Sequence, residues 1–263
     1  MTGLCLDSAA GTNRGHRRVL NEDALWARQP VFMVADGMGG HDAGDRASSI
    51  AIAEMKQLGG TPTVEDVRDA LARARRTIDG LAASDARHAA GTTVSGVVLV
   101  EQAGRPYWLV FNLGDSRTYH MAHGRVEQVS VDHSEVQELL EAGRLDGAGA
   151  RGYGRRNVIT RVLGARTQEC PEYWLLPVET PERWLVCSDG LTQEVSDDTI
   201  ARILTEEESP QGAVEALIDA ALTAGGRDNV TVIVINATGL DPGDDEETIE
   251  DLIVPVGALE VSG

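Results

Sequence analysis

The chain has 263 residues, of which 42% are hydrophobic, so it can bury a sizeable core in one large domain or two small ones. Its formal net charge of -19 makes nucleic acid and anionic membrane surfaces poor partners. It has no apolar run of about 18 residues, no pattern of a signal peptide, and three cysteines without metal-ligand spacing, so we expect a cytoplasmic protein with no membrane partner.

Strand-like and helical patterns follow one another along residues 1–237, which we predict form one domain. Apolar runs predict strands at 31–35, 92–100, 106–113, 116–121, 125–130, 172–177, 183–188 and 229–236. Helical patterns cover 43–58, 64–82 and 135–143, and Ser196 and Ser209 open two more helices. Because strands come in consecutive groups and helices largely in pairs, we expect antiparallel sheets covered by helices.

Two segments lack these patterns. Residues 144–156 are rich in Gly, Ala and Arg, which predicts a mobile surface loop of basic character. Residues 238–263 contain eight Asp and Glu but no Lys or Arg, which predicts a flexible acidic tail. Near its end, Pro255 argues against a central strand.

Four aspartates stand at the ends of predicted strands. Asp36, Asp115 and Asp189 each follow an apolar run, and Asp228 precedes the last one. Because the start of one antiparallel strand lies beside the end of its neighbour, all four can meet at one edge of a sheet. Converging carboxylates repel each other unless cations hold them, so this pattern predicts a metal site.

A further motif precedes these aspartates, and it reads Gly15-x-x-Arg18-x-x-Asn21-Glu22-Asp23. Seven more short motifs follow in order: Asp36-Gly37-Met38-Gly39-Gly40, Gly91-Thr92-Thr93, Gly114-Asp115-Ser116-Arg117, Asp132-His133-Ser134, Arg156-Asn157-Val158-Ile159-Thr160-Arg161, Ser188-Asp189-Gly190 and Arg227-Asp228-Asn229. In these motifs and their order, nearly the whole domain resembles the PP2C-like (PPM) family of metal-dependent protein serine/threonine phosphatases. The compact spacing is most similar to the bacterial single-domain members.

The resemblance implies a fold and an activity. The fold is of the α+β class, a four-layer α-β-β-α sandwich in which helix pairs flank two antiparallel sheets. The activity is hydrolysis of phosphoserine and phosphothreonine on proteins, opposing Ser/Thr kinases in signalling, by direct attack of a water that bridges two Mn²⁺ or Mg²⁺ ions. Two such ions about 3.5–4 Å apart generate a nucleophile at neutral pH and clamp the phosphate. Oxygen ligands suit these ions, and no His/Cys cluster points to zinc.

The resemblance also implies the metal ligands. Asp36 would bridge the two ions. Glu22 and the backbone carbonyl of Gly37 would support one ion, and Asp189 and Asp228 would hold the other. Asp115 resembles the ligand of a third, weaker metal of the family, with Asp189 shared between sites.

Three further roles rest on the same resemblance. Arg18 would clamp the substrate phosphate through its planar fork of donors. Asp23 would support the ligands from behind, and residues 144–156 correspond to the flap that flanks the site and tunes substrate choice. The general acid for the leaving oxygen stays open, because Met38 stands where some members have a histidine; a metal-bound water or His41 could serve.

Phosphorylated proteins are the expected partners, chiefly Ser/Thr kinases and their substrates. Thr248 lies three residues before Asp251, and once phosphorylated it would resemble a ligand of forkhead-associated domains; the alternative is a plain acidic tail. Two alternative functions are a catalytically silent scaffold of the same fold and a phosphatase of one regulator, such as an anti-sigma-factor antagonist. The intact acidic residues speak against the scaffold, and the flap together with Arg18 favours the general phosphatase.

Overall fold

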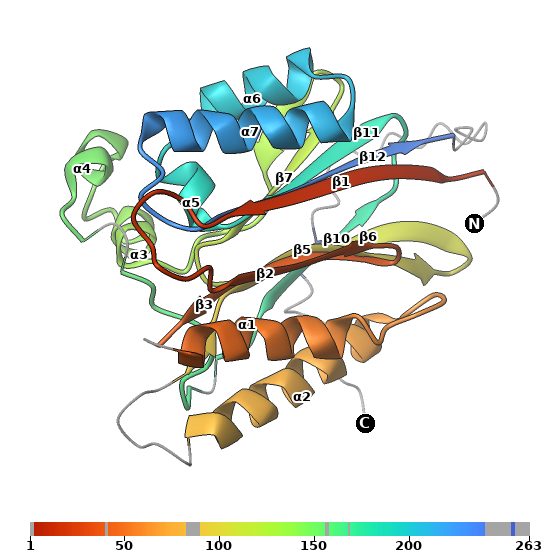
Figure 1. Cartoon of the computed structure of the whole chain (residues 1–263). Helices are drawn as coiled ribbons and strands as arrows, with labels where there is room; N and C mark the ends of the chain where they lie inside the picture. The colour runs from red at the N-terminus through yellow and green to blue at the C-terminus, as the bar shows by residue number, and fades with distance from the viewer. Residues whose placement is uncertain are drawn as a thin grey trace.

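The computed structural model describes residues 3–39, 42–82, 90–155, 158–167, 169–239 and 254–255. Two sheets of antiparallel strands lie face to face, and a pair of helices covers the outer face of each sheet (Figure 1). The expected four-layer α-β-β-α sandwich is confirmed. Within these residues no helix is long and apolar enough to cross a membrane.

The first sheet carries the chain termini of the domain on neighbouring strands. Its order is β1 (Cys5–Asn13), β12 (Val230–Thr238), β11 (Glu182–Cys187), β7 (Arg117–Ala122) and β8 (Arg125–Gln128). A hairpin joins β7 to β8 through His123 and Gly124, both with positive φ, which suits the right-handed twist of the two strands. Helices α6 (Asp197–Glu206) and α7 (Pro210–Ala224) cover its outer face, and Ser196 and Ser209 cap them as expected.

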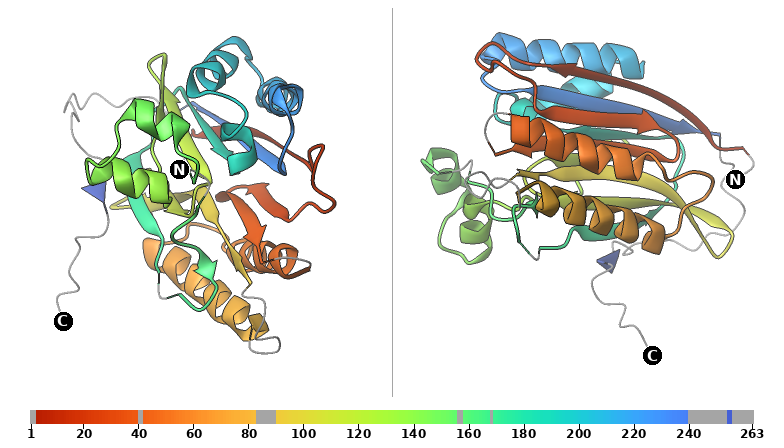
Figure 2. Two further views of the ribbon diagram at one scale, coloured as in Figure 1. Left: turned by 90° about the vertical axis from the view of Figure 1, so that its left-hand side faces the viewer. Right: turned by 60° about the horizontal axis from the view of Figure 1, so that its bottom comes forward.

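The second sheet is larger, and it places four of the eight predicted strands side by side. Its order is β13 (Val254–Pro255), β10 (Glu172–Pro177), β6 (Arg105–Leu113), β5 (Val94–Gln102), β3 (Val31–Met38), β4 (Gly91–Thr92) and β9 (Leu163–Gly164), and β2 (Asp23–Arg28) also pairs with β3. Helices α1 (Asp42–Met55) and α2 (Val64–Ala82) cover its outer face, and Figure 2 shows them along that face from two further sides. β13 is an edge strand, which agrees with the argument against a central strand at Pro255.

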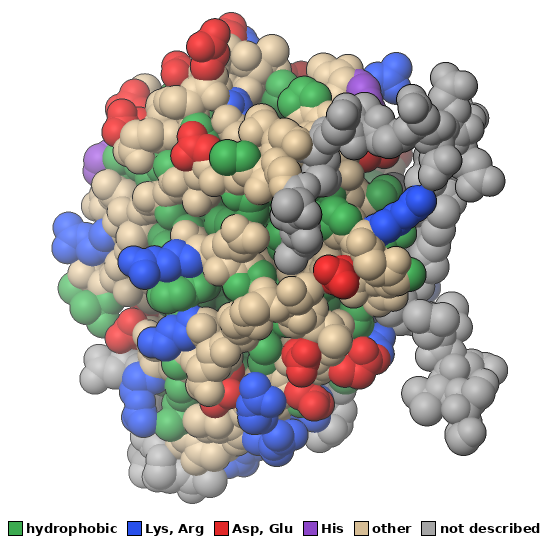
Figure 3. All heavy atoms as spheres, turned by 90° about the vertical axis from the view of Figure 1, so that its right-hand side faces the viewer, with side chains coloured by type: hydrophobic (Ala, Val, Ile, Leu, Met, Phe, Trp, Pro, Cys, Tyr) green, Lys and Arg blue, Asp and Glu red, His purple; other side chains and the backbone are tan. Residues whose placement is uncertain are grey.

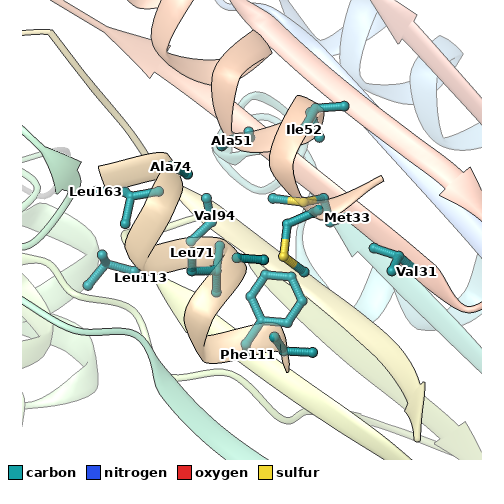
Figure 4. Close-up of a cluster of buried hydrophobic side chains, with 14 of the residues drawn as sticks. Val31, Met33, Ala51, Ile52, Leu71, Ala74, Val94, Phe111, Leu113 and Leu163 are labelled. Atoms are coloured by element: carbon teal, nitrogen blue, oxygen red, sulfur yellow. The ribbon is translucent and has the colours of Figure 1, made fainter. Parts of the chain in front are cut away.

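Strand β3 is apolar throughout because both of its faces are buried. Met33 and Val31 point toward the helices, where they join Leu71 of α2 and Phe111 of β6 (Figure 4). The intervening Phe32 points to the other sheet and belongs to the core between the sheets. This alternation follows from the two-residue period of a strand, and burial on both faces explains why the sequence run has no polar gaps.

Three features of the structure were not expected from the sequence. Strands β1 and β2 carry no clear alternation of apolar residues, because both lie at sheet edges and neither of them is fully buried along its length. The predicted loop 144–156 contains a short helix, α4 (Gly147–Gly152), whose first turn is capped by the side chain of Asp146 accepting from Gly149 N at 2.7 Å. A single-turn helix, α5 (Asp189–Thr192), is too short to show a helical period.

The core of the helix-facing layer yields a stability prediction. Phe111→Ala removes a fully buried ring from this layer, so we expect the free energy of unfolding to fall by about 3–5 kcal/mol. Urea denaturation monitored by circular dichroism measures this change. Val19, which is 82% exposed, provides the control, because Val19→Ala should change stability by no more than about 0.5 kcal/mol. Equal stability of the two variants would contradict the assignment of Phe111 to the core.

Candidate functional site

The aspartates that were expected to share a sheet edge do meet at one end of the sandwich. Asp36 lies within β3, Asp115 follows β6, Asp189 opens α5 and Asp228 precedes β12. Burial raises the pKa of Asp36 well above its usual range, and the negative charges of Asp23, Asp189, Asp115 and Asp228 raise it further. Four carboxylates therefore lie close enough to Asp36 to repel its charge.

Asp189 lies in direct contact with Asp36. Burial, followed by the charges of Asp228 and Asp23, raises the pKa of Asp189 to about 7, while hydrogen bonds from Asp36 and Gln193 oppose this rise. A hydrogen bond between two carboxyl groups requires a proton on one of them, and a cation between them would remove that requirement. Burial likewise raises the pKa of Asp115, helped by the charges of Asp189 and Asp132.

Arg18 lies at the open side of this cluster. Its Nη2 atom donates to Asp228 Oδ2 at 2.6 Å, and half of its side chain is exposed. The hydrogen bond to Asp228 and the charges of Asp228, Asp36 and Glu22 raise the pKa of Arg18 against the effect of burial. The guanidinium group of Arg18, which is always charged, therefore lies where an anion from solvent would first meet the site.

Glu22 is held by a close approach of backbones that needs two glycines. Gly37 N donates to the carbonyl oxygen of Glu22 at 3.2 Å, and Ser48 Oγ of α1 donates to the same oxygen at 2.6 Å. A Cβ atom on Gly37 would lie 2.2 Å from the carbonyl oxygen of Gly44, and one on Gly44 would lie 2.5 Å from Glu22 Oε1. The sequence analysis did not identify Gly44 or Ser48, because neither stands in a recognised motif.

Asp23 lies behind the cluster and is fixed by two hydroxyl groups. Ser188 Oγ donates to Asp23 Oδ2 at 2.8 Å, and Thr231 Oγ1 donates to the same oxygen at 2.6 Å. These bonds connect β2 with the residues beside Asp189 and Asp228. The supporting role that the resemblance implies for Asp23 stays a prediction.

Asn229 joins the loop of Arg18 to the opposite sheet. Its Oδ1 atom accepts from the backbone N of Glu22 at 2.9 Å, and its Nδ2 atom donates to the carbonyl oxygens of Arg14 and Leu20, each at 3.0 Å. The sequence motif around Asp228 included Asn229 but gave it no role. Its amide uses both donors and its acceptor to hold the loop that carries Arg18 and Glu22.

The chemistry of the cluster fits divalent cations that prefer oxygen ligands. Glu22 Oε1, Asp115 Oδ1 and Asp189 Oδ1 are buried and accept no hydrogen bond from any described residue. Buried carboxylate oxygens without partners are costly, and Mn²⁺ or Mg²⁺ would satisfy them. In the described part of the chain, however, no three Asp, Glu, His or Cys side chains already form a ligand set, since Arg18 occupies Asp228 and the amide of Gln193 contacts Asp189. The ligand assignment therefore stays a prediction.

The predicted flap borders the cluster. Helix α3 (Glu135–Glu141) and helix α4 lie on the same side of the molecule as α5 (Figure 1). They enclose a cavity of about 280 Å³ whose walls include Asp115, Asp189 and Ala150 of α4. Of the flap arginines, Arg155 pairs with Glu135 at 2.9 Å, and the side chains of Arg151 and Arg156 lie outside the described residues. His41, one candidate for the general acid, also lies outside them.

His133 connects the loop of Asp115 to the flap and to β10. Its Nδ1 atom accepts from Gly114 N at 3.1 Å, and its backbone N donates to the carbonyl oxygen of Gly114 at 2.8 Å. Burial lowers the pKa of the ring, so a neutral imidazole accepts at Nδ1 and carries its proton on Nε2, which lies 3.2 Å from Glu172 Oε1 without hydrogen-bond geometry. His133 is therefore a positioning residue, and the next residue, Ser134, caps α3 by accepting from Gln137 N.

Comparisons with known proteins identify the family of the chain. A family model described as protein phosphatase 2C matches residues 19–230. The serine/threonine protein phosphatase PstP of Mycobacterium tuberculosis is 35% identical over 245 residues, which cover 91% of this chain and 46% of PstP, so the chain spans about half the length of that relative. The serine/threonine phosphatase stp of Listeria welshimeri is 31% identical over 248 residues, which cover 89% of this chain and 97% of stp.

Solved structures show the same architecture. The crystal structure of the Mycobacterium tuberculosis phosphatase PstP superposes with a TM-score of 0.82 at 32% identity, covering 88% of this chain and 98% of that chain. The catalytic domain of PstP in complex with two manganese ions superposes with a TM-score of 0.80 at 31% identity, covering 89% and 99% of the two chains.

The position of His133 yields a prediction about the loop of Asp115. His133→Ala leaves the buried N–H of Gly114 without its acceptor, so we expect unfolding to require about 1–3 kcal/mol less free energy. His133→Asn is the matched control, because its Oδ1 atom can take the place of Nδ1 and should recover most of this loss. Thermal unfolding of both variants measures the difference. An asparagine variant no more stable than the alanine variant would show that the Gly114 contact is not what His133 supplies.

Proposed function

The chain belongs to the protein phosphatase 2C family, and from this we propose that it hydrolyses phosphoserine and phosphothreonine esters on proteins. One observation carries the proposal: buried carboxylates converge at the end of the sandwich, and the half-exposed Arg18 stands at their open side. In such a site the carboxylates can bind cations, and the cationic side chain lies at the entrance. Both features suit a phosphate ester. The relatives that carry phosphatase names support the same activity.

The proposed cofactors are two Mn²⁺ or Mg²⁺ ions. Asp36 would bridge them, Glu22 and the carbonyl of Gly37 would support one, and Asp189 and Asp228 would hold the other. Asp115, with an unsatisfied buried oxygen, is the proposed ligand of a third ion. When bound, the ions lower the pKa of water and neutralise charge on the phosphoryl oxygens.

The chain's own residues supply binding and orientation. Arg18 would exchange its bond to Asp228 for the substrate phosphate, and its planar fork can donate two parallel bonds to phosphoryl oxygens. The bonds of Ser188 and Thr231 to Asp23 keep the floor of the site rigid during this exchange. The flap cavity beside Asp115 and Asp189 provides space on the substrate side, so residues 144–156 are the proposed determinant of substrate choice.

The proposed protein partners and cellular location follow from the same activity. We propose that the substrates are Ser/Thr kinases and the proteins that these kinases phosphorylate, encountered in the cytoplasm. The proposed forkhead-associated partner depends on Thr248, which lies outside the described residues. A catalytically silent scaffold would be expected to lose ligand residues, whereas Glu22, Asp36, Asp189 and Asp228 are all present.

Metal dependence tests the proposed function directly. With Mn²⁺ we expect hydrolysis of p-nitrophenyl phosphate and of a phosphothreonine peptide. A chelator or Asp36→Asn should each reduce the rate by about 100-fold or more, because metal ions supply several kcal/mol of transition-state stabilisation. Asp7→Asn, which changes an exposed carboxylate of β1, is the control and should keep full activity. Activity that survives both chelator and Asp36→Asn would refute the mechanism, and wild-type protein inactive on every phosphoester would favour the scaffold.

The role of Arg18 yields a second kinetic prediction. A hydrogen bond to a charged group contributes about 1.5–3 kcal/mol, so Arg18→Ala should lower kcat/KM for the phosphopeptide by about 10–100-fold. Arg18→Lys keeps the charge but loses the planar guanidinium group, so its kcat/KM should fall between those of the wild type and of Arg18→Ala. The neighbouring exposed Arg17 serves as the control, since Arg17→Ala should leave kcat/KM unchanged. Similar losses for the two alanine variants would indicate a general effect of surface charge instead of a phosphate clamp.

A further inference from the structure

A cavity of about 750 Å³ lies between helix α2 and strand β10, and none of its lining residues belongs to the candidate site. Leu71 of α2 and Tyr173 and Trp174 of β10 contribute apolar surface. Arg68 and Arg75 of α2 stand among three acidic lining residues, Asp69, Glu169 and Glu172, so the wall as a whole is not basic. The guanidinium of Arg68 lies 5.2 Å from the centre of the Tyr173 ring. The cavity is large enough for several aliphatic side chains.

The edge of β10 beside this cavity already pairs with the end of the chain. In the antiparallel register of β13, Pro255 lies opposite Trp174 and Val254 lies opposite Leu175. Figure 2 shows β13 as the short arrow near the C-terminus, outside the main body of the sheet. Trp174 therefore takes part both in the strand pairing and in the wall of the cavity.

We propose that the cavity and the edge of β10 form a docking surface for the C-terminal segment of the same chain, residues 249–258. The backbone of this segment would extend the sheet through β13. The apolar side chains on either side of β13 would enter the cavity. This mode of recognition combines main-chain hydrogen bonds at a sheet edge with a pocket for alternate side chains.

The composition of the segment matches the surface. Leu252, Ile253 and Val256 supply apolar side chains next to β13. Figure 3 shows both Lys and Arg and Asp and Glu side chains over the lower part of the face, so the match to the segment rests on its apolar side chains and not on charge.

The length of the chain permits docking within one molecule. Residues 240–253 connect Gly239, the last residue described after β12, to β13. A fully extended segment of this length spans up to about 45–50 Å. This reach exceeds the radius of gyration expected for a domain of this size, which is about 18 Å. A tethered segment has an effective local concentration in the millimolar range, which favours its own molecule over a second copy.

The docking surface is connected to the candidate site through β10. Glu172, the first residue of β10, lines the cavity, and its Oε1 atom lies 3.2 Å from His133 Nε2 and 3.0 Å from Arg161 Nη1. His133 in turn holds Gly114, the neighbour of Asp115. Pairing with β13 would therefore steady the strand on which this contact depends.

Disulfide trapping in the full-length chain tests the proposal. Leu175 and Val254 lie opposite each other, so Leu175→Cys with Val254→Cys should form a disulfide under mild oxidation if the segment docks as described. This double-cysteine variant and its control also carry Cys5→Ser and Cys170→Ser, which remove the two exposed native thiols. We expect most of the protein to form a cross-link within one molecule, seen as a monomer in non-reducing electrophoresis and identified by peptide mass spectrometry.

The control pairs Leu175→Cys with Val261→Cys, seven residues beyond Val254 and outside the proposed segment. It should cross-link at least about tenfold more slowly, because a docked strand holds one register, in which Leu175 faces Val254 and not Val261. Equal rates in the two pairs, or cross-linked dimers as the main product of the first pair, would overturn the proposal. Dimers would assign the surface to the tail of a second copy.

Hydrogen exchange provides a measurement without engineered cysteines. Val254→Pro removes an N–H from β13 and places two prolines in succession, so it should prevent strand pairing without touching the domain core. We expect amide exchange of residues 172–177 to become about tenfold faster or more, while Val261→Pro leaves it unchanged. Unchanged exchange in Val254→Pro, with the wild-type melting temperature retained, would show that the edge of β10 is not covered by this segment.

Discussion

The structure depends on burying several like charges at one point. Asp36, Asp115 and Asp189 lose most of their contact with water, and burial is the main cause that raises the pKa of each. Such a cluster is tolerable only when the surrounding elements hold it in place and a cation shares its charge. Both sheets contribute, since Asp36 and Asp115 come from strands of the larger sheet and its connections, and Asp189 and Asp228 adjoin strands of the smaller one.

The two sheets are held together at this end by polar contacts and by close backbone packing. Asp23 of β2 accepts bonds from Ser188 and Thr231 of the opposite sheet, so the floor of the site is itself a link between the layers. Gly190 shows how tightly this end is packed, because a Cβ atom there would lie 1.9 Å from the carbonyl oxygen of Asn229. Side chains at such positions would separate the elements that deliver the carboxylates.

Strand β10 has two roles in the molecule. Through Glu172 it supports His133 and thereby the loop of Asp115, and through its edge it pairs with β13. The aromatic residues of β10 also form one wall of the cavity beside α2.

The sequence by itself predicted antiparallel sheets covered by helices and carboxylates at strand ends, because these depend on local pattern, and the family resemblance added the four layers and the proposed ligands. Burial on both faces makes β3 a continuous apolar run, and the serine caps of α6 and α7 act within a single turn. The motifs around Arg18, Asp36 and Asp228 likewise carry their residue types in the sequence itself.

Only the tertiary structure decided the contacts between distant segments. Strand β1 forms because β12 lies beside it, and Gly44 matters because α1 approaches Glu22. The bond of Arg18 to Asp228 and the contact of His133 with Glu172 also depend on where the sheets bring these residues. Such contacts arise from packing between elements far apart in the chain, and no local pattern of residues records them.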